Sequence, residues 1–338
     1  MNNRIFILVA LMVFAFSACK EKEEKRELLT ERIEYDVTID NEESMESFLN
    51  NVDAGDRLAF LEFLFNELSA GKAVDAYGNS VDEEAVKNLL IEVDTNWFYD
   101  KMDLFQYIRS EMNKVRVLRF REKWTYNPET YSFYKEVIAV APAVVLKDSD
   151  RVVSHIVPLF WVNCDTVDAK KPVLITDLII CDALVQNNTG ETVKLYGESP
   201  GFLHSFDASK REKFFMDLKD NVASHKLNAY DYFFKELGVS EAEALNDHMD
   251  TVYVPDTLGN LIPYEYEVKI LPQDFTRLKF VEKWEYSTNP FVFKKTVMVI
   301  NPSVSVFDDL GEFQGYRPLF WIVFDTADLE HIKSVVRF

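Results

Sequence analysis

Two matched sets, each of one glutamate, one tryptophan and one lysine, are candidates for acid–base chemistry. A carboxyl group that shares an apolar face with tryptophan can have a perturbed pKa and act as an acid or base. The alternative is an ion pair between the acid and the lysine of the same set, which we favour because one strand register serves both sets. The sets are Glu122, Trp124 and Lys135, and then Glu282, Trp284 and Lys295, each 160 positions later.

Strand alternation predicts the register of this pairing, because side chains two residues apart lie on one face of a strand. If Trp124 faces Phe133 across a hairpin, Glu122 faces Lys135. The same register in the second set pairs Trp284 with Phe293 and Glu282 with Lys295.

Four tryptophans recur at matched positions and could stack on sugars or on a partner. They lie in strand patterns with leucine and phenylalanine neighbours, which favours packing in the core of each repeat. They are Trp124, Trp161, Trp284 and Trp321.

Other signatures of catalysis or cofactor binding are absent from the sequence. The five histidines include no HxH or HxxxH pair, and no CxxC occurs, so we expect no metal site. Only 10 glycines occur, and neither a dinucleotide nor a phosphate-binding glycine motif is found. No GxSxG motif is present. We therefore expect no cofactor and no enzymatic activity.

Cys164 comes three positions after Trp161, and Cys181 comes 17 positions later. An oxidising compartment would permit a disulfide between them. Two buried free thiols are an equally acceptable interpretation, because the sequence does not give the distance between their Cα atoms. Phe324 replaces the first cysteine in the second repeat, so a bridge would not belong to the shared fold.

These residues lie in the strands of a long internal repeat. Residues 118–168 and 278–328 align without a gap, from LRFREKWTY and LKFVEKWEY to PLFWVNCDTVD and PLFWIVFDTAD. Alternation within them predicts half-buried strands. Helical spacing precedes each block, with a first helix capped by Asp53 or Asp56 and ended by Gly71. Further helix starts are expected at Ser80, Ser209 and Ser240.

The predicted fold class is α+β, with two tandem homologous domains, each of helices followed by an antiparallel β-sheet. An apolar piece before the second copy, residues 173–185, is expected to finish the first domain as a helix or strand. The expected divisions are a signal peptide at 1–18, a charged tether at 19–47, domain one at 48–168, a linker at 169–205 and domain two at 206–338.

The N-terminus predicts export. Arg4 precedes an apolar run at 5–16, and Ser17 and Ala18 lead to Cys19, an order typical of a secretory signal. The cysteine after small residues resembles a bacterial lipoprotein signal, which implies lipid attachment at Cys19. The charged residues 20–34 then predict a flexible or partly helical spacer. The formal net charge of −20 excludes a nucleic-acid-binding surface, which would be basic.

The repeated block resembles the GldN family, also called PorN, of the type IX secretion and gliding-motility machinery of Bacteroidota. The resemblance rests on EKW, the alternating strand, a proline and Pro-Leu-Phe-Trp followed by valine or isoleucine, with alanine-tyrosine and Asp-Thr segments before the block. It covers most of residues 50–168 and 206–330. Two features depart from the family pattern: the duplication of the domain and the chain's own lipoprotein signal.

The resemblance implies a non-enzymatic subunit or accessory factor of an envelope assembly. The implied partners are a GldK/PorK-like lipoprotein, a GldM/PorM-like subunit and, through the lipid, the outer membrane. The expected location is the outer membrane, facing the periplasm. A cell-surface lipoprotein that binds a carbohydrate or protein ligand is the alternative.

Overall fold

A computed structural model gives the fold, which contains two sets of corresponding elements. The first set is β1 (Glu27–Thr38), α2 (Ala54–Ser69), β2 (Ala73–Val74), β3 (Val117–Tyr126), β4 (Phe133–Lys147), β5 (Val153–Pro158) and β6 (Trp161–Asn163). The residues described are 25–39, 52–86, 115–147, 153–167, 171–185, 207–244, 247–255, 260–307, 311 and 313–335.

The second set begins with β7 and ends with a helix. It comprises β7 (Val173–Leu184), α5 (Ala208–Ala223), α6 (Val239–Glu243), β8 (Asp247–Pro255), β9 (Leu261–Lys269), η2 (Pro272–Asp274), β10 (Phe275–Thr288), β11 (Phe291–Phe307), β12 (Phe313–Pro318), β13 (Ile322–Val323), η3 (Thr326–Asp328) and α7 (Leu329–Val335).

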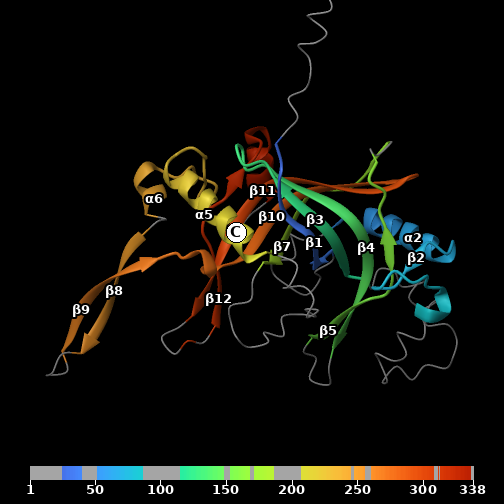
Figure 1. The fold of residues 1–338 in the computed structure, drawn as a ribbon, viewed down its shortest axis with the longest axis horizontal. Helices are drawn as coiled ribbons and strands as arrows, with labels where there is room; N and C mark the ends of the chain where they lie inside the picture. Colours follow the sequence, from blue (N-terminus) through green and yellow to red (C-terminus); the bar gives the residue numbers. More distant parts are fainter. Residues whose placement is uncertain are drawn as a thin grey trace, which may run out of the picture.

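One antiparallel sheet of 11 strands takes strands from both halves of the chain (Figure 1). The order along its main path is β1-β3-β4-β11-β10-β7. β4 and β11 join the two halves, with Lys135 directly opposite Lys295. The end strands β1 and β7 contact one another, so the sheet curls around an interior filled by side chains from both repeats.

β1 and β7 are corresponding strands, and both lie where the sequence predicted connecting segments. β1 places Thr30 opposite Trp124, whereas β7 places Thr176 opposite Trp284. Each threonine bonds the backbone two residues on, at Arg32 or Leu178. The expected spacer at 20–34 is therefore wrong from Glu27 onward, where a sheet strand begins.

β7 also corrects the expected role of the apolar piece at 173–185. That piece is a strand, but it pairs with β10 of the second repeat and does not finish the first. β1 pairs with β3 in the same way. Each repeat therefore begins with an edge strand, ahead of its helix.

The helices α2 and α5 start at aspartate caps. Asp53 accepts hydrogen bonds from the backbone N–H groups of Gly55 and Asp56 at 2.8 and 3.4 Å. Asp207, not the expected Ser209, caps α5. Gly71 follows α2 with a φ of 72°, which suits a residue without a Cβ and confirms the predicted stop.

Each of these helices packs against strands of the other repeat. Phe60 of α2 lies 4.9 Å from the ring of Tyr286 and 5.3 Å from that of Phe293. Phe214 of α5 makes the corresponding edge contacts at 4.8 Å with Tyr126 and 6.0 Å with Phe133. The two repeats therefore share one core.

This arrangement contradicts the predicted fold class. The described structure is mostly β, and the strands of the two repeats form one large antiparallel sheet with few helices. It is not a pair of α+β domains that each place helices before a separate sheet. Period-two alternation indicates strands locally, but it does not indicate whether each copy closes its own sheet. Here the β4–β11 pairing and the crossed helix packing join the two copies.

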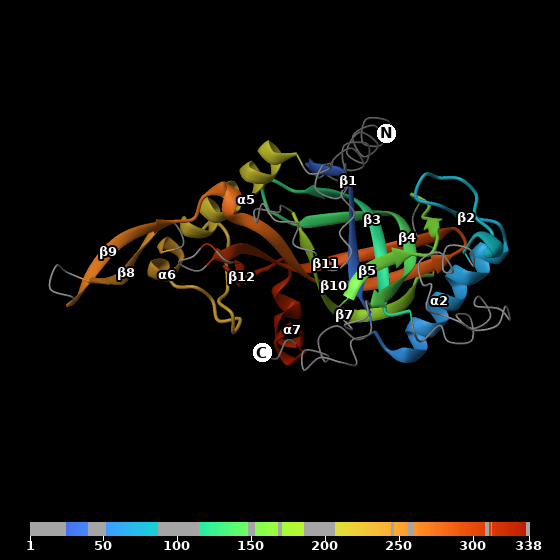
Figure 2. The same cartoon turned by 90° about the horizontal axis from the view of Figure 1, so that it is seen from below.

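A two-stranded sheet, β8–β9, extends away from this body (Figures 1 and 2). Its strands pair antiparallel from Asp247 with Lys269 to Pro255 with Leu261. In both views it lies at the opposite end of the molecule from β2. None of the helices in the described ranges is both long and apolar enough to span a membrane.

Candidate functional site: a buried charged cluster between the repeats

The sheet brings the two matched acid–base sets to one point in its interior. Glu122 and Glu282 lie on β3 and β10 with no exposed surface, and the side chains of Lys135 and Lys295 on β4 and β11 are likewise fully buried. The lysines face each other across the β4–β11 pair. Like charges directly opposite in a sheet are unfavourable, so both must be compensated.

Compensation comes from the acid of the other repeat. Lys135 Nζ lies 2.5 Å from Glu282 Oε1, and Lys295 Nζ lies 2.7 Å from Glu122 Oε1. The prediction that these four residues pair within each repeat is therefore wrong. The groups do form ion pairs, but the partners are exchanged.

The predicted hairpin register is also wrong, by two residues in both repeats. Trp124 lies opposite Lys135, and Phe133 lies opposite Tyr126. In the same register Glu122 lies opposite Val137, and a register shift separates Glu122 from Arg121. β10 and β11 repeat this register and its shift. Alternation in the sequence indicates which side chains share a face, but the turn that joins the two strands decides which residues are opposite.

Tyr35 of β1 completes the cluster. Its hydroxyl donates to Glu122 Oε2 at 2.9 Å and accepts from Lys135 Nζ at 3.0 Å and Lys295 Nζ at 3.1 Å. Trp124 Nε1 donates to the same carboxylate oxygen at 2.7 Å. The cluster therefore links both repeats through one hydroxyl.

Aromatic rings surround the two ammonium groups. Lys135 Nζ lies 3.1 Å from the ring centre of Phe280, and Lys295 Nζ lies 3.2 Å from that of Phe120. A cation over an aromatic face is attracted by the ring quadrupole, and more strongly where water is excluded. Trp284 Nε1 binds the second glutamate at 2.7 Å, as its counterpart does in the first repeat.

The surroundings of Glu282 favour its charged form. Burial alone would raise the pKa of Glu282, but Lys135 and Lys295 and the donated hydrogen bonds hold that pKa below its ordinary value. The pKa of Tyr35 lies well above 10, because burial and then the charges of Glu122 and Glu282 disfavour the phenolate. The tyrosine therefore remains a neutral donor.

The geometry suits stabilisation better than catalysis. A general acid or base must reach a substrate atom, and neither glutamate has any exposed surface. A buried pair that loses one partner leaves an uncompensated charge, which costs roughly 3–5 kcal/mol. The cluster therefore selects the strand register that brings all four charged groups together.

The four matched tryptophans are core residues. Trp124 and Trp284 have no exposed surface, and Trp161 and Trp321 are 2% and 1% exposed. No ring face is open for stacking on a sugar. The interpretation of these residues as core aromatics agrees with their burial.

Cys164 and Cys181 are free thiols in this structure. Burial raises the pKa of Cys164 to about 12. The pKa of Cys181 lies well above 9, because of burial and then the nearby charge of Glu282. Of the two interpretations left open by the sequence, the structure has the unbridged one.

The outer face of the sheet differs between the repeats. In the second repeat, Ile332 of α7 packs against Ile180, Val281 and Trp321. The first repeat has polar residues at two of the corresponding positions, where Arg121 replaces Val281 and Glu34 replaces Ile180.

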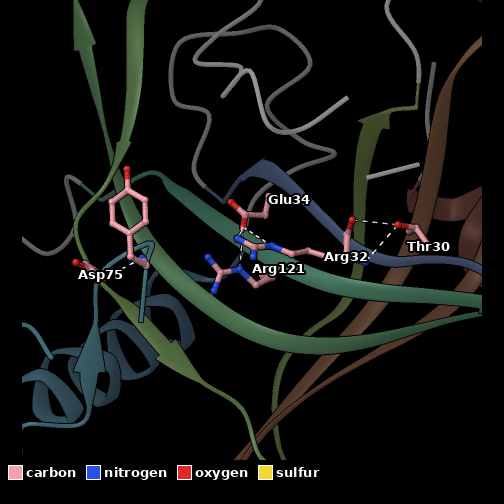
Figure 3. A network of polar contacts seen from close by, with 6 residues as sticks. Thr30, Arg32, Glu34, Asp75 and Arg121 are labelled. Carbon is pink, nitrogen blue, oxygen red and sulfur yellow. Dashed lines mark hydrogen bonds and ion pairs between the residues drawn. The ribbon is translucent and has the colours of Figure 1, made fainter. Parts of the chain in front are cut away.

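Those polar residues form the network shown in Figure 3. Arg121 and Arg32 both donate to Glu34 Oε1, through Nε atoms at 2.8 and 3.0 Å, while Thr30 lies beside Arg32 on the same strand. Burial raises the pKa of Glu34, but the two arginines outweigh it and hold the pKa below its ordinary value. The Arg121 guanidinium also stacks 4.3 Å from the ring centre of Trp161.

Sequence reasoning missed Tyr35, and it considered Cys181, the corresponding residue, only as a possible disulfide partner. Both lie in segments interpreted as connections. A signal was present, because β1 and β7 share leucine, threonine, isoleucine and aspartate at corresponding positions. This similarity was not recognised because the two strands repeat after 146 residues, whereas the main block repeats after 160. Thr30 and Thr176 show the shorter spacing.

Two further expectations concern sites beyond the cluster. Cys19, the expected lipid attachment point, lies outside the described residues. Within the described ranges, no group of three or more histidine, cysteine or acidic side chains could hold a metal ion.

No protein-family model matches the chain, and no curated protein matches it.

Proposed function

We propose that the protein is a non-catalytic subunit of an envelope assembly, held at the outer membrane by a lipid on Cys19 and facing the periplasm. The signal-like N-terminus and the small residues before that cysteine support export and anchoring. Two buried acyl chains hold a protein stably at a membrane, at about 0.8 kcal/mol for each CH₂ group.

One observation carries the assembly role. The residues best suited to chemistry are closed inside the shared core, whereas large apolar side chains are exposed on the projecting hairpin β8–β9. Exposed apolar surface rimmed by polar residues is typical of protein interaction sites. A subunit that must bind neighbours has use for such a surface.

The resemblance of the repeated block to the GldN family gives the proposal its specific form. In that form the partners are a lipoprotein like GldK or PorK and an inner-membrane-anchored subunit like GldM or PorM. The duplicated repeat and the additional anchor distinguish this chain from the family pattern, and they suit an accessory subunit as well as a ring subunit.

Affinity purification from detergent-solubilised envelopes tests the proposal. We expect the native protein to bring secretion or motility subunits with it, in amounts comparable to its own. A Cys19→Ala variant should lose fatty-acid labelling and move to the soluble fraction. Purification without any such subunit would contradict the assembly role, and unchanged membrane fractionation of the variant would contradict the lipid anchor.

Protease treatment of intact cells tests the orientation. A periplasm-facing protein should be spared, whereas a surface protein should be cleaved. Cleavage on intact cells, with an integral periplasmic protein left intact as the control, would favour a surface-exposed lipoprotein instead.

A further inference from the structure

Exposed apolar side chains are concentrated in one part of this molecule. Eight of the fifteen large hydrophobic residues exposed among the described ranges lie between positions 232 and 271. Four of them belong to the hairpin itself, and they are between 48% and 66% exposed: Tyr253, Leu261, Ile262 and Tyr264.

The outer part of the hairpin is exposed on both faces. Tyr253 lies opposite Pro263, and Ile262 and Tyr264 flank that proline on the same strand. Because successive side chains of a strand point to opposite faces, Ile262 and Tyr264 lie on the face opposite to Pro263. Both groups are exposed, so the main body covers neither face there.

A hairpin of this kind is poorly stabilised by itself. A two-stranded sheet in water is marginal unless something packs on it. A flat partner surface would cover one face only. An apolar groove that encloses the strands would cover both faces, which fits the exposure observed.

Charge indicates which partner suits the hairpin. Residues 247–269 include five acidic residues and one lysine, and the whole chain carries a formal net charge of −20. A second copy of this chain would bring like charges together, which is unfavourable across an interface. A groove rimmed by lysine or arginine would be complementary.

We propose that β8–β9 is a docking arm that inserts into an apolar, basic-rimmed groove of a different protein in the assembly. The inference rests on the proposed function and names the surface through which that function operates. The exposed apolar residues of the two strands supply the buried contact, and acidic residues such as Glu265 orient the arm against the basic rim.

Site-specific photo-crosslinking in the full-length protein tests the arm. A benzophenone amino acid replaces Tyr264 in the native envelope, and the same replacement at Tyr77 is the control. Tyr77 is 91% exposed and follows β2, at the other end of the molecule (Figure 2). We expect a crosslink to another protein from Tyr264 and not from Tyr77, with the crosslinked peptide apolar and flanked by lysine or arginine.

Binding of the crosslinked protein, once purified, tests the chemistry. Ile262→Ser with Tyr264→Ser should weaken the dissociation constant at least tenfold, and Glu265→Lys should weaken binding and reduce its dependence on salt. The matched change Tyr77→Ser should leave binding unaltered. Far-UV circular dichroism checks that each variant is folded.

Several outcomes overturn the docking arm. They are no crosslink from Tyr264, a crosslink only to a second copy of this chain, a crosslinked peptide that is acidic, or unchanged affinity in the serine variant. If the native complex is purified but survives the arm variants, the arm is wrong and the assembly role stands. If the native protein brings no subunit with it, the assembly role itself fails.

Discussion

The crossed ion pairs predict which double substitutions should compensate. Glu122→Gln leaves Lys295 without its partner, and Lys295→Met leaves Glu122 without its partner, since these groups lie 2.7 Å apart. Lys135 should behave differently, because its acid is Glu282. The combination of Glu122→Gln with Lys295→Met removes one complete pair and leaves the other intact.

The magnitude follows from burial. All four charged side chains are fully buried, so each single substitution should cost roughly 3–5 kcal/mol of unfolding free energy. Independent effects would sum to about 6–10 kcal/mol. We expect the double variant Glu122→Gln with Lys295→Met to lose clearly less than this sum, because no uncompensated charge remains, with a coupling energy of about 2–3 kcal/mol.

The comparison variant, Glu122→Gln with Lys135→Met, tests the crossing itself. It leaves Glu282 and Lys295, which belong to different pairs, so its losses should be closer to additive. The assay is equilibrium urea unfolding, followed by tryptophan fluorescence and by circular dichroism, with coincident transitions required for a two-state fit. Equal coupling of Glu122 to both lysines, or a larger coupling to Lys135, would refute the crossed arrangement.

Three further predictions concern stability at acid pH, the reactivity of the two cysteines and the turn that contains Gly78. Because the folded-state pKa of Glu282 is lowered, its contribution to stability is present above the ordinary carboxyl pKa of about 4.5 and is lost as the pH falls through the folded value. The free energy of unfolding in urea should therefore fall less steeply at acid pH in the double variant Glu282→Gln with Lys135→Met. An identical fall in both proteins would contradict this. The raised thiol pKa values of Cys164 and Cys181 predict no iodoacetamide labelling of either residue at pH 8 in the folded protein and full labelling of both in urea, as peptide mapping would show. Rapid labelling of the folded protein would contradict the raised pKa values. Gly78→Ala should lower the free energy of unfolding by about 1 kcal/mol, because a φ of 88° is unfavourable for a residue with a Cβ. A steric clash is not the cause, since a Cβ at this position would meet no atom within 4 Å. Unchanged urea unfolding would show that the turn adjusts freely.

The sequence was sufficient to identify the four charged residues of the cluster, but it indicated neither Tyr35 nor the partner of each charge. Glu122 and Lys135 share an interior face, as the alternation predicted, and so do their counterparts. The direct partner depends on the β4–β11 pairing, in which Lys135 faces Lys295. Contacts between repeats of one chain leave no periodic pattern in the sequence, so period-two reasoning could only pair residues within a hairpin.

The class of fold was missed for a related reason. Helix caps and strand alternation are local signals, and they located α2 and β3 correctly. Whether Phe60 of α2 packs on its own repeat or on the other is a tertiary question, and the structure places it on Tyr286 and Phe293. The charged composition of β1 also concealed a sheet strand, because its polar residues face outward and pair with those of β3, as Asp36 does with Arg119.

The single tyrosine of the cluster shows what duplication within one chain permits. Tyr35 and Cys181 occupy corresponding positions, opposite Phe120 and Phe280. The Tyr35 hydroxyl lies almost equally far from both lysines, at 3.0 and 3.1 Å, and therefore midway between the matched ammonium groups of the two repeats. Only one hydroxyl can occupy that position, so the corresponding residue must be smaller, as cysteine is. Two identical chains around a true two-fold axis would carry the same residue at both positions. The covalent link between the repeats removes that constraint, and it allows one asymmetric hydrogen-bond donor to join two otherwise matched ion pairs.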